Sequence, residues 1–209
     1  MKRLLLIFLC LPLMTLAQQT YVPDDNFETY CENQGWGNGV IDDSVYTYNI
    51  SNIGWFDPSG SGLLIYDLTG IEDFSSMTGF ELMGVIDTAG IWMEGILDSV
   101  IDLSNNTNLE YLELSFNPIR SINVTGLNQL ENLGLQNTAL DSIDVSTNIA
   151  LNSLIINTGT NSNWANQIPQ LVSLDLSNNI ALRQLYCNGN NLTSLDLSNN
   201  PLLDFLDCS

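Results

Sequence analysis

The second half of the chain repeats one arrangement of apolar and polar residues. The first copy has the form L-x-x-L-x-L-x-x-N and runs from Leu109 to Asn117. Its central L-x-L has the two-residue period of a β-strand, which places both leucines on one side. The Asn that follows suits a turn, because its side chain bonds nearby backbone and tolerates unusual φ. An amphipathic helix would need apolar residues at i, i+3, i+4 and i+7, so the pattern predicts short strands separated by turns.

The copies recur at a regular interval along the sequence. Units open at equivalent leucines: Leu109, Leu130, Leu151, Leu182 and Leu203. The step from Leu151 to Leu182 is longer than the other steps, which are equal, and this places an insertion near residues 157–170. Each unit also contains the pattern a second time, in its second half, as in the copy from Leu192 to Asn200.

This double repeat predicts a flattened solenoid, mainly β, with parallel β-ladders on both faces and little helix. A single strand with its turn cannot bury its leucines alone, whereas stacked turns bury them as one core. The inward column of the first half-units is therefore expected to be buried, and it comprises Leu112, Leu133, Leu154 and Leu185.

The repeat resembles the leucine-rich repeat family in its nested bacterial form. The stretch from Tyr21 to Glu28, followed by Asp67 to Phe74, is similar to the N-terminal region of secreted, internalin-like members. The resemblance covers residues 21–209. It implies a leucine-rich-repeat solenoid over residues 63–209, with regular units from about residue 97 and a last unit truncated at Ser209.

The sequence departs from the pattern in several places. Leu127, Thr138 and Gly159 stand where the family has Asn. Residues 80–100 fit loosely, with Phe80, Met83 and Val85 at the three apolar positions.

The N-terminus has two predicted parts. Residues 1–17 resemble a secretory signal peptide, with Lys2 and Arg3 before an apolar run and cleavage expected after Ala17. The apolar run is shorter than the ~20 residues that a membrane span needs. Residues 18–62 are expected to cap the solenoid through a short helix that Asp24 or Asp25 begins, and which places Phe27, Tyr30 and Cys31 on one side. No cap is evident at the other end, so self-association through the uncapped C-terminal end is one expectation.

The charge excludes several functions. The chain has 24 Asp+Glu, 4 Lys+Arg and no His, for a formal net charge of -20. Nucleic-acid binding needs Lys and Arg to neutralise phosphates, and the chain offers few of them. Without His, Ser-x-Lys, G-x-S-x-G, P-loop or Cys-x-x-Cys motifs, no catalytic constellation stands out. We expect no nucleic-acid binding, no enzyme activity, no cofactor and no membrane insertion.

Cysteine usage does not predict a disulfide framework. Without residues 1–17 the chain keeps Cys31, Cys187 and Cys208. The last two are one repeat apart, so they are expected on adjacent turns, about 4.8 Å apart and both directed into the core. A small buried hydrophobic side chain is the favoured interpretation of all three, with a reactive thiol as the alternative for Cys31.

Three groups of residues are candidates for binding. The first is the outward face of the first half-units, where aromatic and polar side chains alternate with the buried leucines: Tyr111, Glu113, Asn132, Gln184, Tyr186, Phe205 and Asp207. Outward aromatics suit a protein or glycan surface, but strand propensity alone would also favour them. The second group is Trp164 in the insertion, which can instead fold back onto the solenoid.

The third group is an acidic column on the second half-units, which comprises Asp102, Asp144, Asp175 and Asp196. These carboxylates are weak Ca²⁺ candidates, and a solvated acidic face is the favoured alternative. The sequence thus predicts a secreted, non-catalytic module that binds a protein or surface ligand. The alternatives are a structural or adhesive spacer in a larger envelope protein and a glycan-binding module.

Overall fold

The computed structural model describes residues 18–84, 100–159 and 170–209, and its strands form one long parallel sheet with two small ones. The predicted signal peptide, Trp164 and Val85 lie outside the described residues. The helical elements are α2 (Asp25–Asn33), α3 (Thr47–Ile50) and the 3₁₀ turn η1 (Ile71–Asp73). The strands are β1 (Gln19–Tyr21), β2 (Ser44–Tyr46), β3 (Trp55–Phe56), β4 (Gly79–Glu81), β5 (Val100–Asp102), β6 (Tyr111–Glu113), β7 (Ser121–Asn123), β8 (Asn132–Gly134), β9 (Ser153–Ile155), β10 (Gln184–Tyr186) and β11 (Phe205–Asp207).

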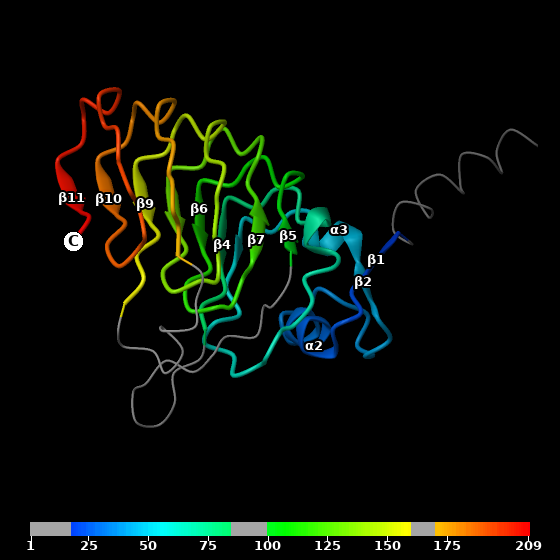
Figure 1. The fold of residues 1–209 in the computed structure, drawn as a ribbon. Coiled ribbons are helices and arrows are strands. Elements are labelled where there is room, and N and C mark those ends of the chain that lie inside the picture. Colours follow the sequence, from blue (N-terminus) through cyan, green and yellow to red (C-terminus); the bar gives the residue numbers. More distant parts are fainter. Residues whose placement is uncertain (1–17, 85–99, 160–169) are drawn as a thin grey trace, which may run out of the picture.

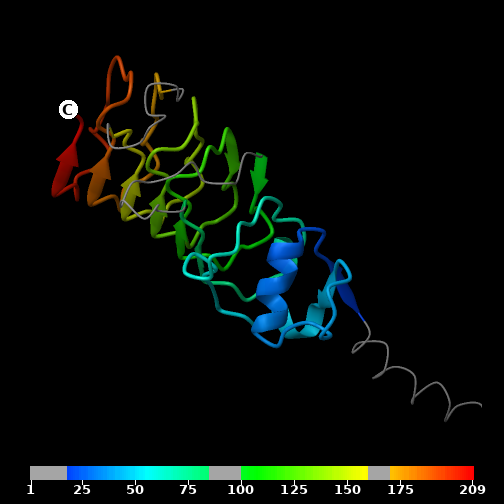
Figure 2. The same cartoon turned by 90° about the horizontal axis from the view of Figure 1, so that it is seen from below.

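Successive turns of the coil stack along one axis in Figure 1, with α2, α3 and β1–β2 at one end and β11 at the other. The main sheet has seven strands in the order β11-β10-β9-β8-β6-β4-β3, all parallel. Figure 2 shows the later strands of this sheet, coloured from green to red, side by side along one edge of the molecule. The predicted mainly β solenoid with a short helical cap is confirmed.

The register of this sheet confirms the predicted leucine column. Leu112 pairs with Leu133, Leu133 with Leu154 and Leu154 with Leu185. All four side chains are buried. The next residue of the column, Leu206 on β11, is 42% exposed because no further turn covers it among the described residues.

Two strands upstream of the regular repeat also belong to the sheet. Phe56 pairs with Phe80, and Phe80 pairs with Leu112. The predicted register that begins at Phe80 is therefore wrong, because Phe80 occupies the middle of the three apolar positions, which are Met77, Phe80 and Leu82. Both early strands keep the apolar spacing of the repeat but have Phe at the central position where later turns have Leu.

The second face does not form the continuous ladder that the repeat predicts. In the described part of the chain it has one strand pair, β5 with β7. Buried Asn side chains join the other turns on this side. The amide of Asn179, for example, donates to the carbonyl oxygens of Val145 at 2.9 Å and Asn148 at 3.0 Å on the preceding turn. Side-chain hydrogen bonds thus replace a backbone ladder on this face.

The N-terminal end packs an aromatic cluster against the first turns. The Asp24 carboxylate caps α2 by accepting from the backbone N–H groups of Asn26 and Phe27, as predicted. The Phe27 ring lies 5.3 Å from that of Phe56 and 5.9 Å from that of Phe74. These contacts join α2 to the solenoid in one hydrophobic core.

Candidate binding surface on the seven-stranded sheet

The outward side of the seven-stranded sheet, here called the sheet face, carries two columns of side chains. Alternation along each strand directs the central residue inward and its two neighbours outward. The register gives the first column as Trp55, Gly79, Tyr111, Asn132, Ser153, Gln184 and Phe205. The second column comprises Glu81, Glu113, Gly134, Ile155, Tyr186 and Asp207. All the described residues that were predicted as ligand contacts therefore share this face, and Trp164 lies outside the described residues.

An aromatic pair lies at the N-terminal part of the sheet face. The rings of Trp55 and Tyr111 are stacked, with centroids 5.3 Å apart and an angle of 27° between their planes. They come from β3 and β6, which β4 separates. Gly79 on β4 makes this contact possible, because a Cβ atom there would lie 2.1 Å from the Trp55 ring. Trp55 remains 52% exposed, so the stacked pair is available to a ligand.

The carboxylates of Asp57, Glu81 and Glu113 adjoin this pair. Burial, and then the charges of Asp57 and Glu113, raise the pKa of Glu81 above its usual value. Burial, and then Glu113, Glu81 and Asp57, likewise raise the pKa of the Tyr111 hydroxyl. Glu113 lies over Gly134, where a Cβ atom would be 2.0 Å from its carboxylate oxygen, and it accepts the Ser115 backbone N–H at 2.9 Å. This part of the sheet face is therefore both aromatic and strongly negative.

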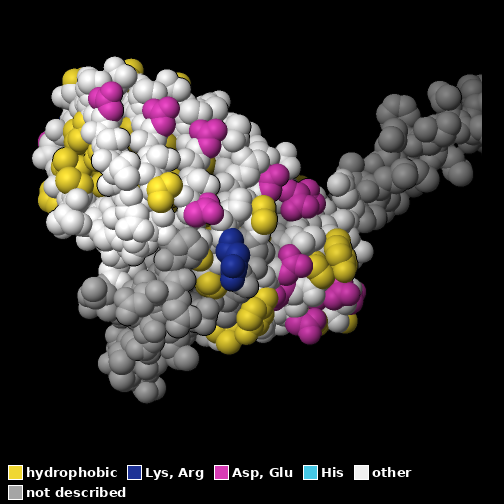
Figure 3. Space-filling view, in the orientation of Figure 1, with side chains coloured by type: hydrophobic (Ala, Val, Ile, Leu, Met, Phe, Trp, Pro, Cys, Tyr) yellow, Lys and Arg dark blue, Asp and Glu magenta, His cyan; other side chains and the backbone are white. Residues whose placement is uncertain are grey.

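A second aromatic pair lies at the C-terminal part of the same face. The rings of Tyr186 on β10 and Phe205 on β11 are stacked, 4.6 Å apart at 29°. Phe205 is 43% exposed, and Gln184 and Asp207 flank the pair in the two columns. Figure 3 shows hydrophobic side chains gathered at the end of the solenoid that carries β11.

Solved structures similar to this chain include internalins of Listeria monocytogenes. The functional domain of InlJ from Listeria monocytogenes, a structure described as including a cysteine ladder, superimposes with a TM-score of 0.51 and 26% sequence identity. Internalin C2 from L. monocytogenes str. 4b F2365 gives a TM-score of 0.53 at 20% identity, over 91% of this chain and 87% of that one. The fold is internalin-like.

The extent of these matches limits the conclusions that can be drawn from them. The InlJ match covers 92% of the internalin-like chain, which spans about half, 48%, of the InlJ domain. No protein-family model matches the sequence, and neither does any curated protein. The likeness therefore establishes the leucine-rich-repeat architecture, and the site must be argued from its own residues.

Sequence reasoning missed the first two strands of the sheet face, β3 and β4, and with them Trp55, Gly79 and Glu81. These strands do carry the apolar spacing of the internalin-like repeat, as Met77, Phe80 and Leu82 around β4 and as Ile53, Phe56 and Pro58 around β3. The spacing of the repeat is therefore present in both strands, but other apolar residues stand at positions where later turns have Leu.

The acidic column on the opposite half of the internalin-like turns has a local structural role. Asp144, Asp175 and Asp196 each accept the backbone N–H of the serine two residues later, at 2.9 Å. Asp102 does the same with Ser104 and also accepts from the Asn123 amide, both at 3.0 Å. Hydrogen bonds from the backbone and the side chain of the serine hold the pKa of each of the four carboxyls below the usual value, and the side-chain bond is the larger cause at Asp144. Figure 3 shows acidic side chains following one another along the solenoid.

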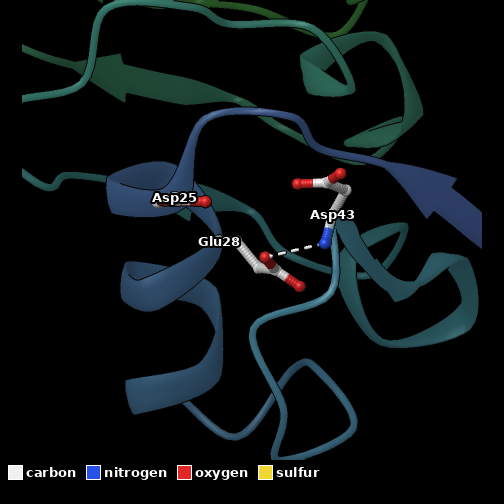
Figure 4. Close-up of side chains that lie close together, drawn as sticks. All are labelled: Asp25, Glu28 and Asp43. Atoms are coloured by element: carbon white, nitrogen blue, oxygen red, sulfur yellow. Dashed lines mark hydrogen bonds between the residues drawn. The ribbon is translucent and has the colours of Figure 1, made fainter.

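One group of three carboxylates in the described ranges is close enough to share a cation. Asp25 and Glu28 of α2 and the loop residue Asp43 bring oxygen atoms within 4.8 Å of one another (Figure 4). Glu28 is fully buried, and its two oxygens accept the backbone N–H groups of residues 42, 43 and 44 at 2.9, 3.0 and 3.0 Å. The buried member therefore serves to fix the loop before β2.

The cysteines differ in exposure. Cys31 in α2 and Cys187 after β10 are buried, as predicted, whereas Cys208 after β11 is exposed, which contradicts the prediction. The pairing of β10 with β11 places Cys187 and Cys208 on adjacent turns. Cys208 directly follows β11, the last described strand of the sheet, and among the described residues only the preceding turn packs beside it. Burial raises the pKa of Cys187 to about 11 and that of Cys31 to about 12.

Proposed function

We propose that this chain is an exported, non-catalytic recognition module that binds a protein ligand through its sheet face. The observation that carries the proposal is the presence of two stacked aromatic pairs, Trp55–Tyr111 and Tyr186–Phe205, on one side of one parallel sheet. Aromatic side chains contribute large contact areas at low entropic cost and are enriched at protein interfaces.

The sheet supplies the rigidity that such a surface needs. Each strand of the face is held by backbone hydrogen bonds to its neighbours, and all but the last also by a buried residue beneath it. The outward side chains are therefore presented at fixed spacing before a ligand arrives. Such preorganisation lowers the ordering cost of binding.

A non-catalytic role agrees with the chemistry of the chain. It has no His, and its buried thiols have raised pKa values that keep them protonated at neutral pH. The carboxylates of the acidic column are engaged in turns. The likeness to internalins supports recognition of a protein over catalysis.

Export is proposed from the N-terminal sequence. Residues 1–17 have the charged start, apolar run and small residue before the cleavage position of a signal peptide. No helix in the described parts of the chain is long and apolar enough to cross a membrane. We accordingly propose cleavage near Ala17 and a secreted or cell-surface location.

One experiment distinguishes the proposed function from two alternatives. A spacer in a larger envelope protein would bind nothing, and a glycan-binding module would use the aromatic pairs for sugar rings. The purified chain is applied to arrays of extracellular proteins and of glycans. Protein hits that weaken at least tenfold when Tyr111, Tyr186 and Phe205 are replaced by Ala support the proposal.

The matched control replaces Asp144, Asp175 and Asp196 by Asn on the other side of the solenoid. Binding that survives the aromatic triple variant and is lost in this control would overturn the choice of face. Glycan hits alone, or no hits on either array, would favour the glycan and spacer alternatives respectively.

A further inference from the structure

Building on the proposed function, we propose that the N-terminal part of the sheet face binds a Lys or Arg side chain from a basic segment of the partner protein. The site consists of the stacked rings of Trp55 and Tyr111 with the carboxylates of Asp57, Glu81 and Glu113, and is called the aromatic–acidic site below. Aromatic faces and carboxylates both attract cations, and here one strand register brings the two together.

The aromatic half of the site is held in place before binding. Trp55 lies over Gly79, where even a Cβ atom would collide with its ring, and its other neighbour is the Tyr111 ring at 5.3 Å. Phe56, directly after Trp55, is fully buried and anchors the strand. An indole face is the strongest of the aromatic partners for a cation, and this one is half exposed to solvent.

The three carboxylates of the site repel one another electrostatically. Burial, and then the charges of Asp57 and Glu113, raise the pKa of Glu81. Burial, and then all three carboxylates, raise the pKa of the Tyr111 hydroxyl. Their negative charges therefore converge on the region beside the aromatic pair. A cation placed there would lower the free energy of all three carboxylates.

The chain itself supplies few cations. It has 4 Lys+Arg against 24 Asp+Glu, and two of the four are Lys2 and Arg3 in the predicted signal peptide. Arg183 faces Asp204 at 3.6 Å, beside β10 and β11 at the far end of the sheet. A net charge of -20 also attracts basic partners from a distance, which raises the rate of encounter.

An organic cation fits the site better than a metal ion. A metal needs several oxygen ligands that converge on one point. Within the described residues, only Asp25, Glu28 and Asp43 bring three such atoms within 4.8 Å of one another. The register instead places Glu81 and Glu113 in the column beside the aromatic one, an arrangement that a guanidinium or ammonium group on a polypeptide can satisfy.

The test uses a short fluorescent peptide with alternating glycine and arginine, and the same peptide with citrulline in place of arginine. Binding to the full chain is measured by anisotropy at about 150 mM NaCl, where long-range attraction between exposed charges is screened. The arginine peptide should bind and the citrulline peptide should not. The charge-neutral change Trp55→Ala and the change Glu81→Gln should each weaken binding about five- to tenfold.

Asp175→Asn is the matched control for Glu81→Gln. It removes one negative charge from the opposite half of the turns. Asn should keep the turn, because Asn123, which pairs with Asp102 in the β5–β7 register, accepts the Thr125 N–H at 3.0 Å. This variant should weaken binding less than about twofold. Equal effects of Glu81→Gln and Asp175→Asn, or no effect of Trp55→Ala, would show attraction by net charge alone and overturn the proposal. Unchanged thermal unfolding of Trp55→Ala confirms that the variant is folded.

A failure here is distinguishable from a failure of the proposed function. Trp55→Ala and Glu81→Gln are also applied to the protein array. If they leave the hits intact while Tyr186→Ala with Phe205→Ala removes them, the sheet face binds proteins without the aromatic–acidic site. If neither pair of changes alters any hit, the proposed function itself is wrong.

Discussion

The side-chain amide of Asn179 donates a hydrogen bond to the backbone carbonyl of Asn148, 3.0 Å away on the preceding turn. The side-chain amide of Asn148 likewise donates to the backbone carbonyl of Leu127, 2.9 Å away on the turn before it. Asn200 continues the series with Asn179, also at 2.9 Å. All three asparagines are buried, so each turn is tied to the last where no backbone ladder exists among the described residues.

Asn179→Ala should therefore lower the free energy of unfolding by about 2 kcal/mol, since it removes two buried hydrogen bonds worth about 1 kcal/mol each. Asn178→Ala is the control, because the neighbouring Asn178 is exposed and donates one bond, to Ser146 at 3.1 Å. Its effect should stay below about 0.5 kcal/mol. Urea unfolding measures both variants, and equal losses would contradict the role of the buried series.

Glu28→Gln should destabilise the N-terminal end. The buried carboxylate accepts three backbone N–H groups, and an amide offers only one acceptor oxygen in place of two. We expect a loss of about 1–3 kcal/mol in urea unfolding, the cost of leaving a buried donor unpaired. Asp25→Asn, at an exposed member of the same group, is the control and should change little.

Calcium should leave the melting temperature of the chain unchanged. Glu28 already uses both oxygens on backbone donors, and the acidic column uses its carboxylates in turns. Differential scanning fluorimetry with millimolar CaCl₂ and with EDTA tests this. A rise in melting temperature with calcium that Asp25→Asn removes would contradict the structural role assigned to this group.

Glu81→Gln should stabilise the free protein at pH 7. The folded chain raises the pKa of Glu81, so this group's favourable contribution is complete below its unfolded pKa and is lost as the pH rises through its folded pKa. The Gln variant does not titrate and avoids that loss. Thermal unfolding should show a higher melting temperature for the variant at pH 7, and no difference near pH 3, below the ordinary range of Glu.

The three described cysteines should react with maleimide in a fixed order. Cys208 is exposed, whereas Cys187 and Cys31 are buried and have pKa values raised to about 11 and about 12. Because the thiolate is the reactive form, modification at pH 7.5 should reach Cys208 first. Peptide mass spectrometry assigns each site. Modification of Cys187 before Cys208 would contradict the arrangement of the last two turns.

The regular part of the solenoid could be predicted from the sequence because one signal repeats there in register. The central leucine of each repeat, at Leu112, Leu133 and Leu154, pairs with its equivalent on the next turn and so fixes how the turns stack. The helix with its Asp24 cap was also predictable, since capping is a local interaction. The aromatic residues of β6, β10 and β11 could be placed outward by alternation alone.

Other features depend on contacts between turns of different length, which spacing does not encode. Trp55 meets Tyr111 only because β3, β4 and β6 align, although the connection from β4 to β6 is longer than that from β3 to β4. The second ladder was predicted from the same L-x-L pattern. Asparagine side chains join the turns there instead, and a strand pattern alone does not distinguish the two kinds of hydrogen bond.

Connections between neighbouring strands of the main sheet differ in length, and those from β4 to β6 and from β9 to β10 are the longest. Every strand pair is nevertheless in register. The pairing of adjacent strands is thus independent of the number of residues that connect them. The chain between two strands can therefore vary in length by about half a turn's worth of residues while the strands on either side keep their register.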